Sequence, residues 1–108
     1  TMMQDFKDED FENKIKNEKV SVILYSAIWC NPCKIYKPVL SKLSDSEEFK
    51  NKANFYYGDI ENAAINAASS AGIRSIPTTV IYKLGQEVDR MTGYPGEAHA
   101  KEFLSKNI

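Results

Sequence analysis

The apolar positions of the first 25 residues follow two patterns. Residues 5–17 carry Phe6, Phe11 and Ile15 among charged side chains, a spacing that predicts an amphipathic helix with acidic residues toward its start. Residues 20–25 are almost continuously apolar and β-branched, which is typical of a central strand covered on both faces. We therefore expect a helix that leads into a buried strand.

A second helix is predicted shortly after this strand. Asn31-Pro32 can open it, because a proline in the first turn lacks only an N–H group that would have had no partner. Apolar residues then recur at helical spacing, at Tyr36, Val39, Leu40 and Leu43. Pro38 interrupts this pattern and removes a backbone hydrogen bond, so we expect the helix to bend there.

Two further elements extend the alternation of strands and helices. Residues 54–59 have the aromatic content of a second main strand. Residues 62–71 are rich in alanine and end at Gly72, which predicts a helix with a glycine beyond its last turn. The order to this point is strand, helix, strand, helix, as in an α/β protein.

The last third of the chain predicts a hairpin and a final helix. Residues 78–82 and 87–92 are separated by Leu84-Gly85-Gln86, a pattern that favours two antiparallel strands. Residues 97–107 are expected to form a helix whose buried side carries Ala100, Phe103 and Leu104. The chain shows no internal repeat, low-complexity stretch or linker.

Length and charge exclude several classes of partner. With 108 residues the chain has the commonest domain size, and we expect residues 1–108 to form one domain. Fourteen basic and fifteen acidic residues give a net charge of −1, so no electrostatic argument favours nucleic acid or an anionic membrane. The apolar run from Val20 to Trp29 contains two serines and is too short to span a membrane.

The N-terminal segment indicates in which cellular compartment the protein acts. The first twenty residues are acidic and amphipathic, unlike a secretory leader, so the cytoplasm is the expected location. Thr1-Met2-Met3 resembles the remnant of a tag. A leader removed ahead of it would place the protein in the periplasm or outside the cell.

The chain has two cysteines, three residues apart in Trp29-Cys30-Asn31-Pro32-Cys33. A disulfide over so short a loop adds little stability through chain entropy, so chemistry explains the pair better than scaffolding. Cys30 is expected at a helix start, where unpaired N–H groups favour a thiolate, and Lys34 adds a positive charge. We therefore expect Cys30 to be the exposed attacking thiol and Cys33, which faces the sheet, the sheltered resolving thiol.

Three other interpretations of the cysteine pair stay open. A zinc site needs four ligands, and His99 is the one further candidate, far along the chain and expected on the surface. An iron–sulfur cluster shared between two chains needs no further ligand. Two buried, inert cysteines are the third possibility. We expect no bound metal and no cofactor besides the disulfide itself.

Three separated motifs resemble those of the thioredoxin family. Residues 29–34 are similar to its active-site motif, with Asn31 where familiar members have glycine. Residues 72–78, Gly-Ile-Arg-Ser-Ile-Pro-Thr, resemble its second signature, and Gly93 stands where the family keeps a glycine after its last strand. Pro38 also matches the proline of the active-site helix. The resemblance covers nearly the whole chain.

The resemblance implies a thioredoxin fold, with a central mixed β-sheet of four to five strands flanked by helices on both faces. It also implies a cis peptide bond between Ile76 and Pro77 beside the cysteines, whose backbone edge pairs with an extended substrate segment. The resemblance also implies a substrate groove beside this edge. Its apolar rim would be formed by Trp29, Ile73, Ile76, Gly93 and Tyr94. For Ile73, a place in the hydrophobic core is nearly as well supported. The residues that support the cysteines would be Trp29, Asn31, Pro32, Lys34 and Pro77.

The activity that the resemblance implies is reduction of protein disulfides by dithiol–disulfide exchange. The chain has no glycine-rich dinucleotide motif, so another protein must supply electrons, and the resemblance implies a flavin-containing thioredoxin reductase. We expect a monomer. The alternatives are an oxidase, isomerase or cytochrome-maturation reductase outside the cytoplasm, and a non-catalytic binding module or cluster-bridged dimer on the same fold.

Three positions depart from the family pattern. Leu24 stands six residues before Cys30, where many thioredoxins bury an aspartate that helps to take the proton from the resolving thiol. Tyr57 aligns with the usual lysine partner of that aspartate, and Ser26 stands where an aromatic residue often packs. The departures remove neither the attacking nor the resolving cysteine, but they leave the redox potential, the rate of resolution and the natural partner open.

Overall fold

The computed structural model describes residues 3–108, so Thr1 and Met2 of the predicted tag remnant lie outside the described residues. The strands are β1 Gln4–Phe6, β2 Ser21–Ser26, β3 Asn54–Asp59, β4 Thr78–Lys83 and β5 Gln86–Thr92. The helices are α1 Asp10–Asn13, the 3-10 turn η1 Ile15–Asn17, α2 Asn31–Ser44, α3 Ile65–Ser70 and α4 Glu97–Asn107.

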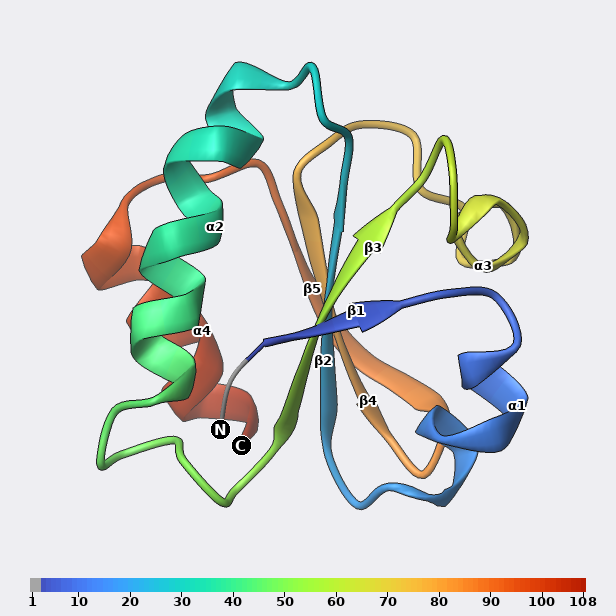
Figure 1. The fold of residues 1–108 in the computed structure, drawn as a ribbon. Helices are drawn as coiled ribbons and strands as arrows, with labels where there is room; N and C mark the ends of the chain where they lie inside the picture. Colours follow the sequence, from blue (N-terminus) through green and yellow to red (C-terminus); the bar gives the residue numbers. More distant parts are fainter. Residues whose placement is uncertain (1–2) are drawn as a thin grey trace.

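The five strands form one mixed sheet in the order β1-β3-β2-β4-β5 (Figure 1). The pairs β1·β3 and β2·β3 are parallel, whereas β2·β4 and β4·β5 are antiparallel. The predicted hairpin is confirmed, and its two-residue turn has positive φ at Leu84 and Gly85, as a tight turn between antiparallel strands requires. The expected fold class is confirmed.

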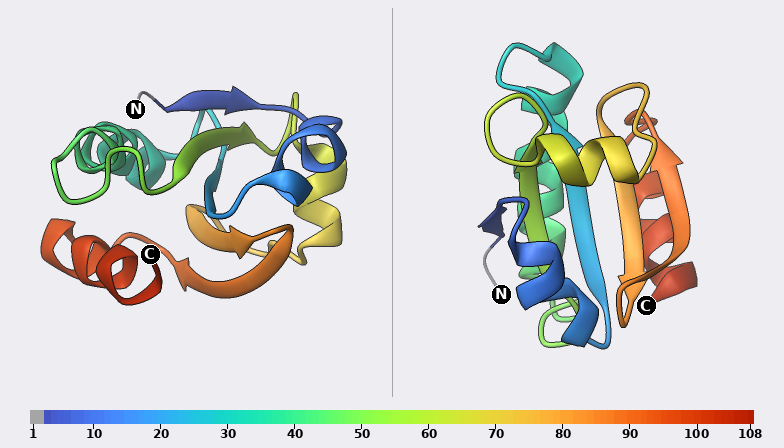
Figure 2. Two further views of the ribbon diagram at one scale, coloured as in Figure 1. Left: turned by 90° about the horizontal axis from the view of Figure 1, so that it is seen from below. Right: turned by 90° about the vertical axis from the view of Figure 1, so that its right-hand side faces the viewer.

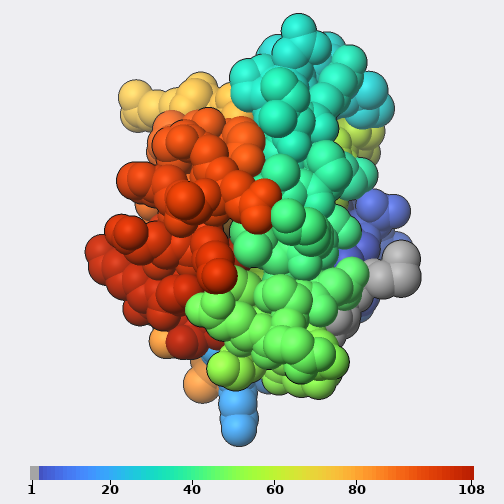
Figure 3. All heavy atoms as spheres, turned by 90° about the vertical axis from the view of Figure 1, so that its left-hand side faces the viewer, coloured from blue at the N-terminus to red at the C-terminus, as the bar shows by residue number. Residues whose placement is uncertain are grey.

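Helices cover both faces of the sheet. In Figures 1 and 2, α2 and α4 lie on one face, and α1 and α3 lie on the other. Figure 3 shows α2 and α4 side by side on the surface of the first face. An ion pair between Lys42 and Glu97, with 3.0 Å between Nζ and Oε2, connects these two helices.

The central strand β2 is buried along its whole length. Val22 and Leu24 belong to the apolar cluster under α2 and α4, and Ile23 and Tyr25 belong to the cluster under α1 and α3. Because successive side chains of a strand point to opposite faces, a strand between two helical layers is apolar at consecutive positions. This arrangement explains the nearly unbroken apolar run that predicted it.

The predicted helix over residues 5–17 is wrong at its start. Residues Gln4–Phe6 are a strand that extends the sheet beside β3, and Phe6 is buried there. The first helix begins only at Asp10, whose Oδ2 accepts a hydrogen bond from the N–H of Lys7 over 3.0 Å. The spacing of apolar residues could not show that one edge of β3 is free to pair with this segment.

The other predicted elements agree more closely with the structure. Strand β3 and helix α4 have the predicted bounds, and α2 continues through Pro38 to Ser44. Helix α3 begins at Ile65 rather than at residue 62. The carboxylate of Asp59 accepts hydrogen bonds from the backbone N–H groups of Glu61 and Asn62, and this turn delays the helix.

Candidate active site

Cys30 and Cys33 meet at the start of α2. Cys30 caps the N-terminus of the helix, and its Sγ accepts a hydrogen bond from the backbone N–H of Cys33 over 3.3 Å. The two residues form a disulfide, with their Cα atoms 5.2 Å apart. Cys30 Sγ therefore lies at the positive end of the helix dipole, where a thiolate is favoured over a thiol.

The predicted exposure of Cys30 is wrong for this disulfide form. Cys30 is 4% exposed and Cys33 is 2% exposed, so both residues are sheltered. Ala27 and the partly buried side chains of Ile60 and Ile76 pack around the pair. These neighbours come from three separate segments, so spacing along the chain could not reveal them. The two cysteines differ in the cavities that they line rather than in exposure.

A cavity of about 550 Å³ opens beside Cys30. Its walls come from the active-site motif and from the loop before β4, and its lining residues are Trp29, Cys30, Asn31, Pro32, Arg74, Ser75 and Ile76. The Sγ atom of Cys30 lies 3.9 Å from the carbonyl oxygen of Ile76. A peptide segment in this cavity can therefore reach a reactive sulfur and a backbone edge together.

Hydrogen bonds on both sides of Pro77 hold the loop that faces Cys30. The Ile76–Pro77 peptide bond is cis, as the resemblance implies. The hydroxyl of Thr78 donates to the carbonyl of Ser75 over 2.7 Å, and the N–H of Gly93 donates to the carbonyl of Pro77 over 2.7 Å. Gly93 has a φ of 81°, which glycine adopts without strain. Gly93 thus supports the loop through its backbone.

The predicted apolar rim is only partly assembled around the cavity. Trp29 and Ile76 line it, and Trp29 is 63% exposed. Ile73 packs against the apolar cluster under α1 and α3, which is the core position that its sequence context left open. Tyr94 stacks on Tyr36 with ring centroids 4.6 Å apart. A role of Ile73 or Tyr94 in substrate binding stays a prediction.

Three side chains at the site lie outside the predicted set. Arg74 and Ser75 line the cavity beside Cys30, and their place within the second motif was a signal that could have found them. Glu61 accepts a hydrogen bond from Nε1 of Trp29 over 2.7 Å. Glu61 follows β3, far from Trp29 in the sequence, so no local pattern connects the two residues.

A second cavity, of about 280 Å³, lies beside Cys33. Its lining comes from strands β2 and β3, from α2 and from the turn before α2. The lining residues are Ser26, Ala27, Ile28, Cys33, Lys34, Lys37 and Tyr57. Lys34, which was expected to add positive charge near Cys30, lines this cavity instead. Lys37 Nζ lies 3.8 Å from the centroid of the Tyr57 ring, a cation–π contact. The lining therefore carries two ammonium groups and no carboxylate.

The family departures at Leu24 and Tyr57 are neighbours in the sheet. The two residues are cross-strand partners in the β2·β3 ladder. Leu24 is fully buried, and the partly buried ring of Tyr57 packs against the same apolar cluster. The Leu24–Tyr57 contact in this chain is therefore apolar. The correspondence of Tyr57 to the family's lysine stays a prediction.

Three buried tyrosines of the core, Tyr25, Tyr36 and Tyr82, are neutral at physiological pH. The hydroxyl groups of Tyr36 and Thr79 share a hydrogen bond of 2.8 Å, and burial raises the pKa of Tyr36 to about 12. The hydroxyl groups of Tyr25 and Tyr82 lie 2.9 Å apart. Burial also raises the pKa of both of these tyrosines. These four side chains supply no base for the cysteines.

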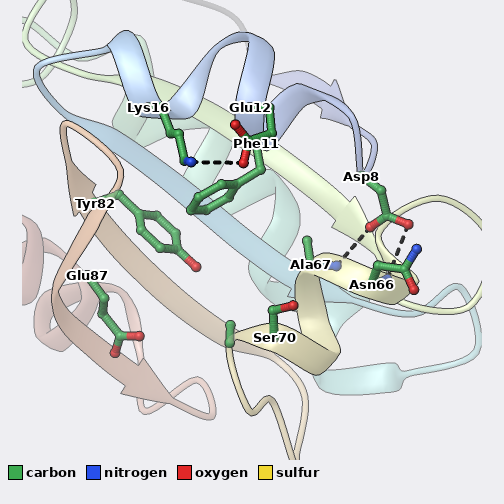
Figure 4. A pocket seen from close by; sticks show the side chains of 10 residues that line it. Asp8, Phe11, Glu12, Lys16, Asn66, Ala67, Ser70, Tyr82 and Glu87 are labelled. Atoms are coloured by element: carbon green, nitrogen blue, oxygen red, sulfur yellow. Dashed lines mark hydrogen bonds and ion pairs between the residues drawn. The ribbon is translucent and has the colours of Figure 1, made fainter.

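A third pocket, of about 430 Å³, lies between α1 and α3 on the face opposite α2 (Figure 4). Several of its polar groups already have partners. Asp8 accepts hydrogen bonds from the backbone N–H groups of Asn66 and Ala67, and Lys16 forms an ion pair with Glu12 at 2.9 Å. No cysteine lines this pocket, so it is separate from the redox chemistry.

His99 is an exposed residue of α4, as predicted. Among residues 3–108, no three or more His, Cys, Asp or Glu side chains are grouped so that they could hold a metal ion. None of the helices in this range is long and apolar enough to cross a membrane.

Comparison with known proteins decides the family. The thioredoxin family model matches residues 2–106. The chain belongs to the thioredoxin family. It is 42% identical over 84 residues to thioredoxin Asp f 29 of Aspergillus fumigatus, which covers 77% of this chain and 74% of the relative. It is 33% identical over 101 residues to thioredoxin of Staphylococcus aureus, covering 94% and 93% of the two chains.

The fold is also similar to that of a solved thioredoxin. The crystal structure of Malassezia sympodialis thioredoxin (Mala s 13) matches with a TM-score of 0.86 at 31% identity, over 96% of this chain and 89% of that one. Family membership and the disulfide between Cys30 and Cys33 together make this protein a thiol–disulfide oxidoreductase. Its substrates are proteins that contain disulfides.

Proposed function

We propose that Cys30 is the attacking thiolate and Cys33 the resolving thiol in the reduction of protein disulfides. Cys30 attacks one sulfur of the substrate disulfide, and the other sulfur leaves as a thiolate. Cys33 then loses its proton and attacks Cys30 Sγ, which forms the Cys30–Cys33 bond and releases the second substrate sulfur. Two electrons pass to the substrate, and its two thiolates take up two protons.

The position of Cys30 at the N-terminus of α2 carries this assignment. Its Sγ already accepts the N–H of Cys33, and this bond together with the helix dipole lowers the energy of the thiolate. Cys30 also lines the cavity whose wall includes the exposed Trp29. Cys33 lies within the helix and lines a different cavity, so a substrate disulfide in the first cavity meets Cys30.

The backbone of Ile76 is the proposed guide for the substrate. Its carbonyl oxygen lies 3.9 Å from Cys30 Sγ, so an extended peptide that pairs with this edge would bring its disulfide to the sulfur. Main-chain pairing of this kind is largely independent of side-chain identity. We therefore infer that the protein accepts many disulfide-containing proteins, with Trp29 and the exposed Asn31 and Pro32 as contact residues.

We also propose how the protein is recharged. The Cys30–Cys33 disulfide is the redox group, and a flavin-dependent thioredoxin reductase returns the two electrons. Family membership supports this partner, as does a sequence without a glycine-rich dinucleotide motif. In keeping with the family, we propose that the protein is a monomer and that it acts in the cytoplasm.

Variants of the two cysteines test the assignment of roles. Cys30→Ser should abolish the acceleration of disulfide reduction by dithiothreitol. Cys33→Ser should instead accumulate a mixed disulfide with the substrate, and peptide mapping should place it on Cys30. Turnover by Cys30→Ser, or an adduct on another residue, would contradict the proposal.

The reduction potential tests the proposed direction of electron flow. Equilibration of the protein with glutathione redox buffers should give a potential at or below about −230 mV, in the range of cytosolic reductases. A potential of about −180 to −120 mV, which is typical of disulfide isomerases and oxidases, would contradict a reductase and favour the oxidase or isomerase alternative.

A further inference from the structure

The resolving step requires a place for the proton of Cys33. Only the thiolate attacks a disulfide, and Cys33 is 2% exposed. Leu24 and Tyr57 leave no carboxylate at the position where many thioredoxins have one. The route for this proton must therefore be sought among the other groups that line the cavity beside Cys33.

Ser26 is the unusual member of that lining. Ser26 is fully buried, and its hydroxyl has no hydrogen-bond partner among the described residues. It follows Leu24 by two positions on β2, so its side chain points to the same face of the sheet, toward α2. Buried hydroxyl groups are rarely left unpaired. An unpaired one that lines a cavity beside a reacting thiol therefore suggests a function.

The cavity can hold the water that would connect Ser26 to Cys33. Its volume is about 280 Å³, whereas a water molecule occupies roughly 30 Å³ in the liquid. Ser26 makes no direct hydrogen bond to Cys33 in the disulfide form. Water in this cavity would satisfy the hydroxyl, which can accept one hydrogen bond while it donates another.

The charged groups around the cavity favour loss of a proton from Cys33. Lys34 and Lys37 on α2 and Tyr57 on β3 are the titratable side chains in its lining, and a nearby ammonium stabilises a thiolate. Asp5 and Asp59 line an adjoining cavity that shares Lys37 and Tyr57.

Asp59 is already engaged by other donors. Its two carboxylate oxygens accept hydrogen bonds from the side chain and backbone of Asn62 and from the backbone N–H of Glu61. These hydrogen bonds lower the pKa of Asp59 although burial acts in the opposite direction. Ser26 lines the same cavity as Cys33, whereas Asp5 and Asp59 line the adjoining one.

We propose that the Ser26 hydroxyl, through water in the cavity that it shares with Cys33, carries the proton away from the Cys33 thiol during resolution. The proton passes from Cys33 Sγ through this water and the Ser26 hydroxyl to bulk solvent, while the Cys33–Cys30 bond forms and the bond from Cys30 to the substrate sulfur breaks. The released substrate thiolate takes up a proton from solvent, so charge and electrons balance. Ser26 is a positioning residue that acts through water, and its role rests on the resolving function proposed for Cys33.

A chromogenic aromatic disulfide, Ellman's reagent, separates the two steps. Attack by reduced Cys30 releases one coloured thiolate, and resolution by Cys33 releases the second. Stopped-flow absorbance of reduced Ser26→Ala should show an unchanged first phase and a second phase slowed about tenfold or more near pH 7, since positioned proton transfer contributes roughly 10²–10⁴-fold. The midpoint of its pH–rate profile should move to higher pH. Ser26→Thr, which keeps the hydroxyl, should restore the second phase.

Ser21→Ala is the matched control. Ser21 is also fully buried on β2, at the opposite end of the strand, and its hydroxyl donates to Glu18 over 2.7 Å. This variant should leave both phases unchanged. Because no protein group within residues 3–108 pairs with the Ser26 hydroxyl, its loss leaves no protein partner unsatisfied and should not destabilise the fold. Slower resolution by Ser26→Ala at an unchanged denaturant midpoint therefore separates proton transfer from structural damage.

The outcomes distinguish this proposal from the proposed roles of the cysteines. Cys33→Ser must abolish the second phase, and a second phase that survives would overturn the resolving role itself. If that variant behaves as expected, an unaltered second phase and pH profile in Ser26→Ala would overturn the role of Ser26 alone. Equal slowing in Ser21→Ala, or a Ser26→Thr variant as slow as Ser26→Ala, would also overturn it.

Discussion

A buried hydrogen bond connects the helix that carries the cysteines to the strand that follows Pro77. The hydroxyl groups of Tyr36 on α2 and Thr79 on β4 lie 2.8 Å apart, and both residues are fully buried. Tyr36→Phe leaves the Thr79 hydroxyl unpaired, and Thr79→Val leaves the Tyr36 hydroxyl unpaired. Each single variant should therefore lose about 1–3 kcal/mol of unfolding free energy.

The double variant should lose less unfolding free energy than the sum of the losses of the two single variants. With both hydroxyl groups replaced by apolar groups of similar shape, no unpaired polar atom remains, so the total loss should stay within about 1–2 kcal/mol. The stack of Tyr36 on Tyr94 is kept by phenylalanine. The coupling energy of the double-mutant cycle should be about 1–2 kcal/mol.

Chemical denaturation of the four proteins in the disulfide form measures this cycle, because a fixed redox state keeps the reference constant. In thermal melts, the Tm of each single variant should fall by about 4–8 °C for each kcal/mol of unfolding free energy that is lost, as in domains of roughly this size. Single variants within about 0.3 kcal/mol of the wild type would refute the reasoning. Strictly additive losses would refute it as well.

Two further changes test the buried groups beside the site. Because burial raises the pKa of Tyr36 from 10.0 to about 12, its contribution to stability should be complete below pH 10 and lost as pH rises through about 12. Tyr36→Phe should weaken that alkaline loss in denaturation midpoints, and an unchanged pH profile would contradict it. Leu24→Asp should cost about 3 kcal/mol or more, since Leu24 is fully buried. Burial would raise the pKa of the introduced carboxyl group, so this loss should grow as pH rises above about 4; equal losses at low and high pH would contradict it.

The elements predicted correctly depend on local patterns. Residues Asn54–Asp59 form a strand with the expected bounds, and Glu97–Asn107 form a helix that buries Ala100, Phe103 and Leu104. A tight turn, an alternation of apolar residues and a helical stripe are each set by neighbours along the chain. The same holds for Cys30 at the start of α2, because Pro32 in the first turn marks that end of the helix.

The features that were missed depend on partners distant in sequence. Phe6 lies in a strand because β3 offers an unpaired edge, and Cys30 is sheltered because Ile60 and Ile76 pack against it. Glu61 reaches Trp29 from the loop after β3. Ser26 was recognised as a departure from the family, but only the fold shows that its hydroxyl is unpaired beside Cys33.

The stoichiometry of a single turnover tests the central claim most directly. Reduced protein is mixed with a limiting amount of a protein that has one disulfide, and mass spectrometry after thiol alkylation counts the products. One Cys30–Cys33 disulfide should form for each substrate disulfide that is reduced, since two electrons pass between the same two pairs of sulfur atoms. Reduction of the substrate without formation of the Cys30–Cys33 disulfide, or no reduction at all, would contradict the account.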